Sequence, residues 1–151
     1  LFSSIIYTGK GTVISNKYKD MPITSQVVAS LLEPLLNQGY CVTTDNYYTS
    51  PQLTDFLLKH NTDTYGTMRI NRKETPKFIQ TQKLKKGEMI AAQKGKVTIM
   101  KWHDKRDVCI LSTVHNTEQV TTNKTDKDGN SIMKPKVIID YNDTMGGVDR
   151  L

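Results

Sequence analysis

The chain has 151 residues, of which 24% are charged and 36% hydrophobic, and its formal net charge is +6. This composition excludes a disordered tail and a membrane protein, and the length fits one ordinary domain or a piece of a larger protein. The start of the sequence lacks the basic segment of a signal peptide and reads as the middle of a strand, which suggests a fragment.

Alternating strands and helices are predicted for the first part of the chain. Residues 3–11 are expected to form a strand that runs into a turn. Hydrophobic residues then repeat with helical spacing from 27 to 36, with Ser25 as the expected N-cap. Pro34 should kink or shorten this helix, and Gly39 should follow its end.

The alternation continues beyond this helix. "YCVTT" (40–44) predicts a buried strand that ends at Asp45. Ser50 and Pro51 form an N-cap and first-residue pair for a second helix. "TYGTMRI" (64–70) predicts a third strand. The order strand, helix, strand, helix, strand favours an α/β layer with some parallel pairing.

Shorter strands are predicted after residue 70. One short helix is expected within 71–80, followed by an antiparallel meander of the strands 87–93, 96–102 and 107–114. The polar stretch near 116–134 is expected to be a mobile loop. "KPKVIIDYN" then predicts a strand, and "DTMGGVDRL" predicts the entrance of a helix.

Positive charge is concentrated in residues 69–106. This segment holds twelve Lys and Arg residues against three acids, whereas the remainder holds nine against twelve. Such a basic segment is expected of a polyanion-binding protein. The charge alone equally fits a solvated basic surface.

The cysteines and histidines give little sign of a site. Cys41 and Cys109 lie in apolar runs and are expected to be reduced, buried core residues. No Cys or His pair has metal-ligand spacing. His60, His103 and His115 are scattered, and none is placed in the sequence to pair with a nucleophile.

Two acids occupy positions suited to catalysis. Asp45 follows a strand, and in open α/β sheets ligand sites gather beyond the carboxyl ends of strands. Asp149 lies in the glycine-containing stretch "DYNDTMGGVD". Two carboxylates brought together repel unless a cation lies between them, and their hard oxygens suit Mg²⁺ or Mn²⁺. The sequence pattern leaves open that Asp45 forms an Asx-turn or helix cap, and that Asp149 interacts with a helix dipole.

A family resemblance adds to this pattern. The stretches that carry it are "YTGKGT", "LLEPLLNQGYCVTTDNYYTSPQL", "YGTMRINRK", "LKKGE", "KWHDKRDVCILSTVHN" and "KPKVIIDYNDTMGGVDR". Together they resemble the piggyBac family of transposases and their transposable-element-derived relatives. The resemblance implies an α/β, RNase H-like core with a mixed sheet and flanking helices, interrupted by a β-rich insertion. The expected segments are the first part of the core (1–70), the basic insertion (71–134) and the return to the core (135–151).

The resemblance also implies an activity. Family members cut DNA with three aspartates and a divalent metal, Mg²⁺ or Mn²⁺, excise the element through hairpin ends and integrate it at TTAA. Asp45 matches the family's "DN-aromatic-aromatic-TS" motif and Asp149 its "GGVD" motif, so both are expected to be catalytic metal ligands. The first aspartate of the triad is expected upstream of "LFSSIIYTGKG", so the isolated chain is predicted to be inactive. A nuclear location and a homodimer of the full-length protein are also implied.

DNA contacts are predicted next to these acids. The expected phosphate contacts are Arg69, Arg72, Lys73, Lys83, Lys85 and Lys86. Tyr47 and Tyr48 fit base stacking and core packing equally well, whereas Trp102 is expected in the core. Two other functions stay open: a domesticated DNA-binding relative without nuclease activity, and a non-functional remnant.

Overall fold

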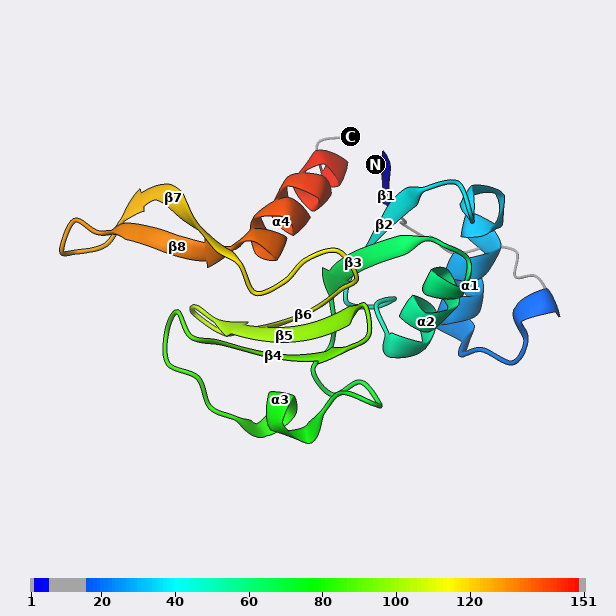
Figure 1. Cartoon of the computed structure of the whole chain (residues 1–151), viewed down its shortest axis with the longest axis horizontal. Coiled ribbons are helices and arrows are strands. Elements are labelled where there is room, and N and C mark those ends of the chain that lie inside the picture. Colours follow the sequence, from blue (N-terminus) through cyan, green and yellow to red (C-terminus); the bar gives the residue numbers. More distant parts are fainter. Residues whose placement is uncertain (1, 6–15, 150–151) are drawn as a thin grey trace.

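A computed structural model describes residues 2–5 and 16–149, which form a mixed six-stranded sheet, a separate two-stranded hairpin and flanking helices (Figure 1). The sheet order is β1-β2-β3-β6-β5-β4. The strands are β1 (Phe2–Ile5), β2 (Tyr40–Thr44), β3 (Asp63–Thr67), β4 (Met89–Lys94), β5 (Val97–His103), β6 (Asp107–Ser112), β7 (Gln119–Thr125) and β8 (Ser131–Pro135). The helices are α1 (Ile23–Leu32), α2 (Pro51–Lys59), α3 (Lys77–Thr81) and α4 (Lys136–Asp149), with short 3₁₀ turns at Asn16–Tyr18 and Glu33–Leu35.

The first half of the sheet is parallel, as the alternating pattern predicted. β1 pairs with β2 and β2 with β3, both in parallel, and α1 and α2 form the connections. Part of the strand and turn expected at 3–11 lies outside the described residues. Parallel strands end at a common edge, so Asp45, directly after β2, lies at the edge where ligand sites gather.

The helix boundaries test the predicted caps. Ser50 caps α2 as predicted: its Oγ accepts a hydrogen bond from the Leu53 N–H at 3.1 Å, and Pro51 is the first helical residue. Pro34 shortens the preceding helix as predicted, because α1 gives way to a 3₁₀ turn there. The prediction for Ser25 is wrong. α1 begins after Pro22, and Ser25 is buried inside its first turn.

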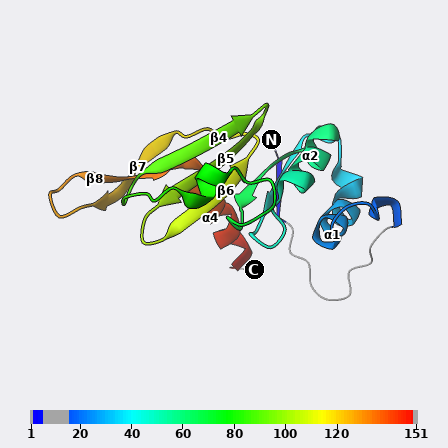
Figure 2. The ribbon, with the colours of Figure 1, turned by 90° about the horizontal axis from the view of Figure 1, so that it is seen from below.

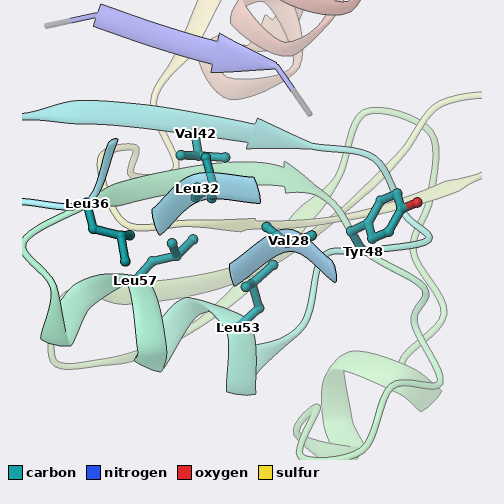
Figure 3. Close-up of a cluster of buried hydrophobic side chains, with 7 residues drawn as sticks. All are labelled: Val28, Leu32, Leu36, Val42, Tyr48, Leu53 and Leu57. Atoms are coloured by element: carbon teal, nitrogen blue, oxygen red, sulfur yellow. The ribbon is translucent and has the colours of Figure 1, made fainter. Parts of the chain in front are cut away.

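Both faces of the sheet are covered. Successive strand residues point to opposite faces, so neighbours in β2 belong to different cores. Val42 packs with the apolar faces of α1 and α2, as Figure 3 shows. Cys41 packs on the other face with Val137 and Ile138 of α4. Continuing the alternation, Asp45 follows Cys41 onto the side of the sheet that α4 covers.

The second half of the sheet is the predicted antiparallel meander. β6 pairs with β3 and β5, and β4 pairs with β5, all antiparallel. Trp102 is buried in β5 as predicted, with 5% of its surface exposed. The strands expected in the insertion therefore continue the core sheet, joined to it by the pairing of β6 with β3. The three segment boundaries given above remain predictions.

The two cysteines are free and buried, as predicted. Burial raises the pKa of Cys41 and of Cys109 to about 11. Both side chains are therefore neutral thiols at physiological pH and behave as small core residues. No helix among the described residues has the length and apolar character needed to cross a membrane.

The loop predicted near 116–134 is a β-hairpin in the structure, and its mobility stays a prediction. β7 and β8 pair antiparallel there and form a hairpin with an irregular register between Thr121 and Thr125. Asp126 closes the turn, because its Oδ1 accepts the N–H groups of Asp128 and Asn130 at 2.9 and 3.0 Å. The hairpin lies at the opposite end of the molecule from α1 and α2 (Figures 1 and 2).

The prediction of a strand over "KPKVIIDYN" is also wrong. Lys136–Asp149 is one continuous helix, α4. Val137, Ile138 and Tyr141 are spaced to share one helix face, and all three join the core cluster that includes Tyr65. A short β-branched run cannot be assigned by periodicity alone, and tertiary packing decides it here. Asp149 consequently ends a helix instead of lying in its first turn.

Candidate active site

The loop after β2 holds Asp45 in a defined orientation. Asp45 Oδ1 accepts a hydrogen bond from the Tyr47 N–H at 3.0 Å, which confirms the Asx-turn interpretation. The Asp45 carbonyl accepts from the Tyr48 and Thr49 N–H groups at 3.1 and 3.0 Å. An ionised carboxylate has about four acceptor positions, so this turn is compatible with metal binding by the same side chain. The half-buried carboxylate is thus oriented before any ligand arrives.

A tight contact between β2 and β3 supports this loop. Thr49 Oγ1 lies 2.6 Å from Thr44 Oγ1 and donates to the Asp45 carbonyl at 2.8 Å. Gly66 pairs with Thr44 across the strands. A Cβ at position 66 would lie 2.1 Å from the Thr44 carbonyl oxygen and 2.8 Å from Thr49 Oγ1. Only glycine permits this approach, and sequence reasoning missed it although a glycine inside a strand is a signal of close backbone contact.

Two arginines surround the same loop. Arg72 Nη2 donates to the Asn46 carbonyl at 3.2 Å and to the Tyr47 carbonyl. The Arg69 guanidinium lies 5.4 Å from the centre of the Tyr47 ring, within cation–π range. Partial burial, and then the neighbouring Arg69 charge, lower the pKa of Arg72. The structure therefore brings predicted DNA contacts to the Asp45 loop, and it gives Arg72 a structural role that the sequence did not predict.

The adjacent tyrosines have different environments. The Tyr47 side chain is 48% exposed, whereas Tyr48 is 8% exposed and belongs to the core beneath α1 and α2 (Figure 3). Their rings meet edge to face, with centroids 4.9 Å apart. Base stacking requires an accessible ring face. Tyr48 is therefore a core residue in this structure, and only Tyr47 keeps the predicted stacking role.

The predicted lysine contacts lie on the surface. The exposed members of the set are Lys73, Lys83, Lys85 and Lys86. The basic segment is not a uniform solvated surface, however. Lys101 is 1% exposed, and its Nζ donates to the Gln82 carbonyl at the start of the loop that carries three of these lysines. Lys101 thereby ties this loop to β5.

Helix α4 reaches the same edge of the sheet. Thr67 Oγ1 at the end of β3 donates to the Tyr141 hydroxyl at 3.1 Å. Burial raises the pKa of Tyr141, the hydrogen bond from Thr67 lowers it, and the negative charge of Asp45 raises it further. Asp149 follows eight residues later, about 12 Å along the helix axis. Its side chain lies outside the described part of the structure, so its pairing with Asp45 remains a prediction.

The donor chemistry at Asp45 fits a hard divalent cation. Its oxygens are oriented at the strand edge and are partly accessible, which suits Mg²⁺ or Mn²⁺. Among the described residues, no three His, Cys, Asp or Glu side chains are grouped as a metal site. Asp45 and Asp149 are the residues of this chain that would share such an ion.

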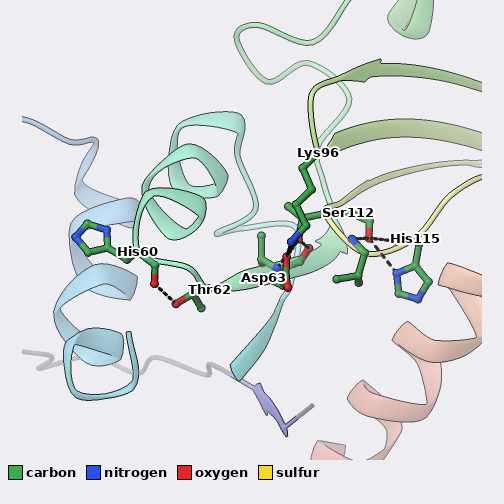
Figure 4. Close-up of polar contacts among 9 residues, drawn as sticks. His60, Thr62, Asp63, Lys96, Ser112 and His115 are labelled. Carbon is green, nitrogen blue, oxygen red and sulfur yellow. Dashed lines mark hydrogen bonds and ion pairs between the residues drawn. The ribbon is translucent and has the colours of Figure 1, made fainter. Parts of the chain in front are cut away.

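His115 contacts two side chains that are distant from one another in the sequence. His115 Nδ1 lies 2.9 Å from Ser112 Oγ, and its Nε2 lies 2.7 Å from Asp140 Oδ2. Figure 4 shows the Ser112–His115 contact. Ser112 is completely buried, and its Oγ accepts the N–H groups of Val114 and His115 at 3.1 and 2.9 Å. This serine is therefore a structural hydrogen-bonding group and not an accessible nucleophile.

Comparisons with known proteins identify the family. A family model described as Transposase IS4 matches residues 1–151. The chain also resembles a solved structure, the cryo-EM structure of the piggyBac transposase synaptic complex with hairpin DNA, with 26% identity and a TM-score of 0.69. The match covers 95% of this chain and 29% of that chain. The chain therefore belongs to this DDE transposase family and is piggyBac-like.

Proposed function

We propose that the chain forms part of the catalytic core of a transposase that cuts and joins DNA at TTAA sites by two-metal phosphoryl transfer. The observation that carries this proposal is the oriented Asp45 carboxylate at the carboxyl end of β2, together with the hydrogen bond that holds Tyr141, on the helix that bears Asp149, to Thr67 at the end of the neighbouring strand β3. Bound Mg²⁺ or Mn²⁺ would supply Lewis-acid activation of the attacking and leaving oxygens. Asp45 and Asp149 would hold those ions, and the Asx-turn would keep the Asp45 oxygens in place.

The basic surface would position the DNA. Arg69, beside Tyr47, and the exposed lysines would contact phosphates, and Tyr47 would stack on an unpaired base. The substrates would be the transposon ends and the TTAA target. The full-length protein would act in the nucleus as a homodimer. The similar solved structure, a transposase in complex with hairpin DNA, supports the DNA-binding part of this proposal.

DNA cleavage by the natural full-length protein tests this function. With Mn²⁺ and a duplex that carries the element's terminal inverted repeat, we expect a specific nick with a 3′-OH, read on a denaturing gel. Residues 1–151 alone should leave the duplex intact, because the family resemblance assigns a third catalytic aspartate outside them. A 3′-OH nick by the purified segment would contradict the predicted inactivity. Binding without cleavage by the full-length protein, in either ion, would favour a domesticated DNA-binding protein.

The lysine-rich loop gives a second test. Combined replacement of Lys83, Lys85 and Lys86 by glutamine should reduce the slope of log K against log salt by about three units, since each phosphate contact contributes about 0.9. Fluorescence anisotropy over a salt series measures this slope. Folding stability should stay unchanged because all three side chains are exposed. Lys59→Gln, an exposed charge on α2, is the control, and an equal loss of slope there would refute the assignment.

A further inference from the structure

A partly buried hydrogen-bonded chain connects the end of β6 to α4. It runs from Ser112 Oγ to His115 Nδ1 (2.9 Å) and from His115 Nε2 to Asp140 Oδ2 (2.7 Å). The His115 side chain is only 10% exposed, and the Asp140 side chain is 34% exposed. The histidine thus joins two elements whose contacting residues, His115 and Asp140, are 25 positions apart in the sequence.

The contacts define which nitrogen carries the proton. Ser112 Oγ already accepts two backbone N–H groups, so its own hydroxyl hydrogen is available to donate. His115 Nδ1 lies 2.9 Å from Ser112 Oγ, and as the acceptor of that hydrogen it is unprotonated. Nε2 consequently carries the hydrogen and donates to Asp140 Oδ2.

The aromatic surroundings fix the ring as well. The Tyr65 ring meets the His115 ring edge to face, with centroids 4.7 Å apart. The Tyr65 hydroxyl lies 3.1 Å from Thr144 Oγ1, one helical turn beyond Asp140. Two successive turns of α4 are therefore attached to the sheet by side chains that contact each other.

We propose that His115 is a positioning residue that fixes α4, and with it Asp149, relative to Asp45. This inference rests on the proposed function, since it assumes that Asp149 acts with Asp45. Asp149 lies nine residues after Asp140, so a tilt of roughly 10° at the attached turn would move it by about 2 Å. A displacement of about 1 Å can cost on the order of 100-fold in rate. Loss of this attachment would therefore lower the rate of DNA cleavage. His115 would act through the position of α4 and not on the DNA itself.

Four single variants of the natural full-length protein test the proposal. His115→Ala and Asp140→Ala remove the connection, whereas Asp140→Asn retains it because the amide oxygen still accepts from Nε2–H. Lys136→Ala is the matched control on the same helix: it removes the ion pair of the Lys136 Nζ with Asp140 Oδ2 at 3.7 Å and leaves the His115–Asp140 hydrogen bond in place. For each variant we would measure hydrogen exchange of the α4 amides, the Mn²⁺ concentration for half-saturation, and kcat and KM for DNA cleavage.

In the two alanine variants, the α4 amides should exchange faster and the Mn²⁺ concentration for half-saturation should rise. kcat should fall by about 10- to 100-fold, with KM for DNA unchanged. Asp140→Asn and Lys136→Ala should behave like the unaltered protein. Unchanged α4 exchange in His115→Ala, a parallel rise in KM, or an Asp140→Asn defect as large as that of Asp140→Ala would each overturn the proposal. The exchange measurement needs neither metal nor DNA. If the alanine variants show faster α4 exchange but the unaltered protein does not cleave DNA, the proposed function is refuted. The attachment of α4 by His115 would still stand.

Discussion

Replacing Gly66 by alanine will destabilise the protein by about 3 kcal/mol, the upper end of the usual cost of overpacking. The added Cβ would lie 2.1 Å from the Thr44 carbonyl oxygen, a backbone atom that cannot rotate away. β2 and β3 must then separate at the point where Thr44 pairs with Gly66. Because Thr49 would also be displaced, the loop that orients Asp45 should move with the strands. Chemical denaturation measures the loss of stability.

Gly146→Ala is the control for this substitution. Gly146 lies inside α4, and a Cβ there meets no described atom within 4 Å. Alanine is favoured over glycine in a helix by about 0.5–1 kcal/mol, so this variant should be neutral or slightly stabilised. A Gly66→Ala protein with unchanged stability would show that β2 and β3 approach each other less closely than this structure has them.

The parallel half of the fold is predictable because its signals are local. The β-branched run before Asp45 has no competing helical pattern, and Ser50 followed by Pro51 defines a helix start without help from the rest of the chain. The hairpin of β7 and β8 lacks such a signal. Its residues are largely exposed and polar, so no apolar alternation distinguished these strands from a loop.

Helix α4 was not predicted for a different reason, because its local sequence favours a strand. Val137, Ile138 and Ile139 are consecutive β-branched residues, which favour a strand when only neighbours in sequence are considered. The helix forms because Val137 and Ile138 bury against Tyr65, and because Asp140 and Tyr141 find hydrogen-bonding partners in the loop after β6 and in β3. Those partners lie at least 25 residues away, beyond any local pattern.

The same contrast between local signals and long-range contacts applies to the candidate site. The position of Asp45 follows from its place after a strand, and its catalytic role from the family motif. Gly66, Arg72 and His115 were missed as supporting residues because each acts on a segment that only folding brings close. Arg72 was predicted as a phosphate contact from its charge, yet its guanidinium binds the carbonyls of the loop that follows Asp45. Charge identifies a candidate, and packing decides what the charge contacts.

Replacing Asp45 by asparagine should reduce DNA cleavage by the natural full-length protein by about 10³-fold while leaving its stability within about 0.5 kcal/mol. Asparagine keeps the Asx-turn, since its side-chain oxygen still accepts the Tyr47 N–H, but it removes the negative charge that a divalent metal requires. Single-turnover cleavage with Mn²⁺ measures the rate, and denaturation verifies the fold. Asp55→Asn, at an exposed position on α2, should alter neither quantity. Full activity of the Asp45→Asn protein would remove Asp45 from the catalytic set. If the loss of cleavage is accompanied by a comparable loss of folding stability, Asp45 would act only by holding the turn. This substitution therefore separates the two roles that the sequence left open.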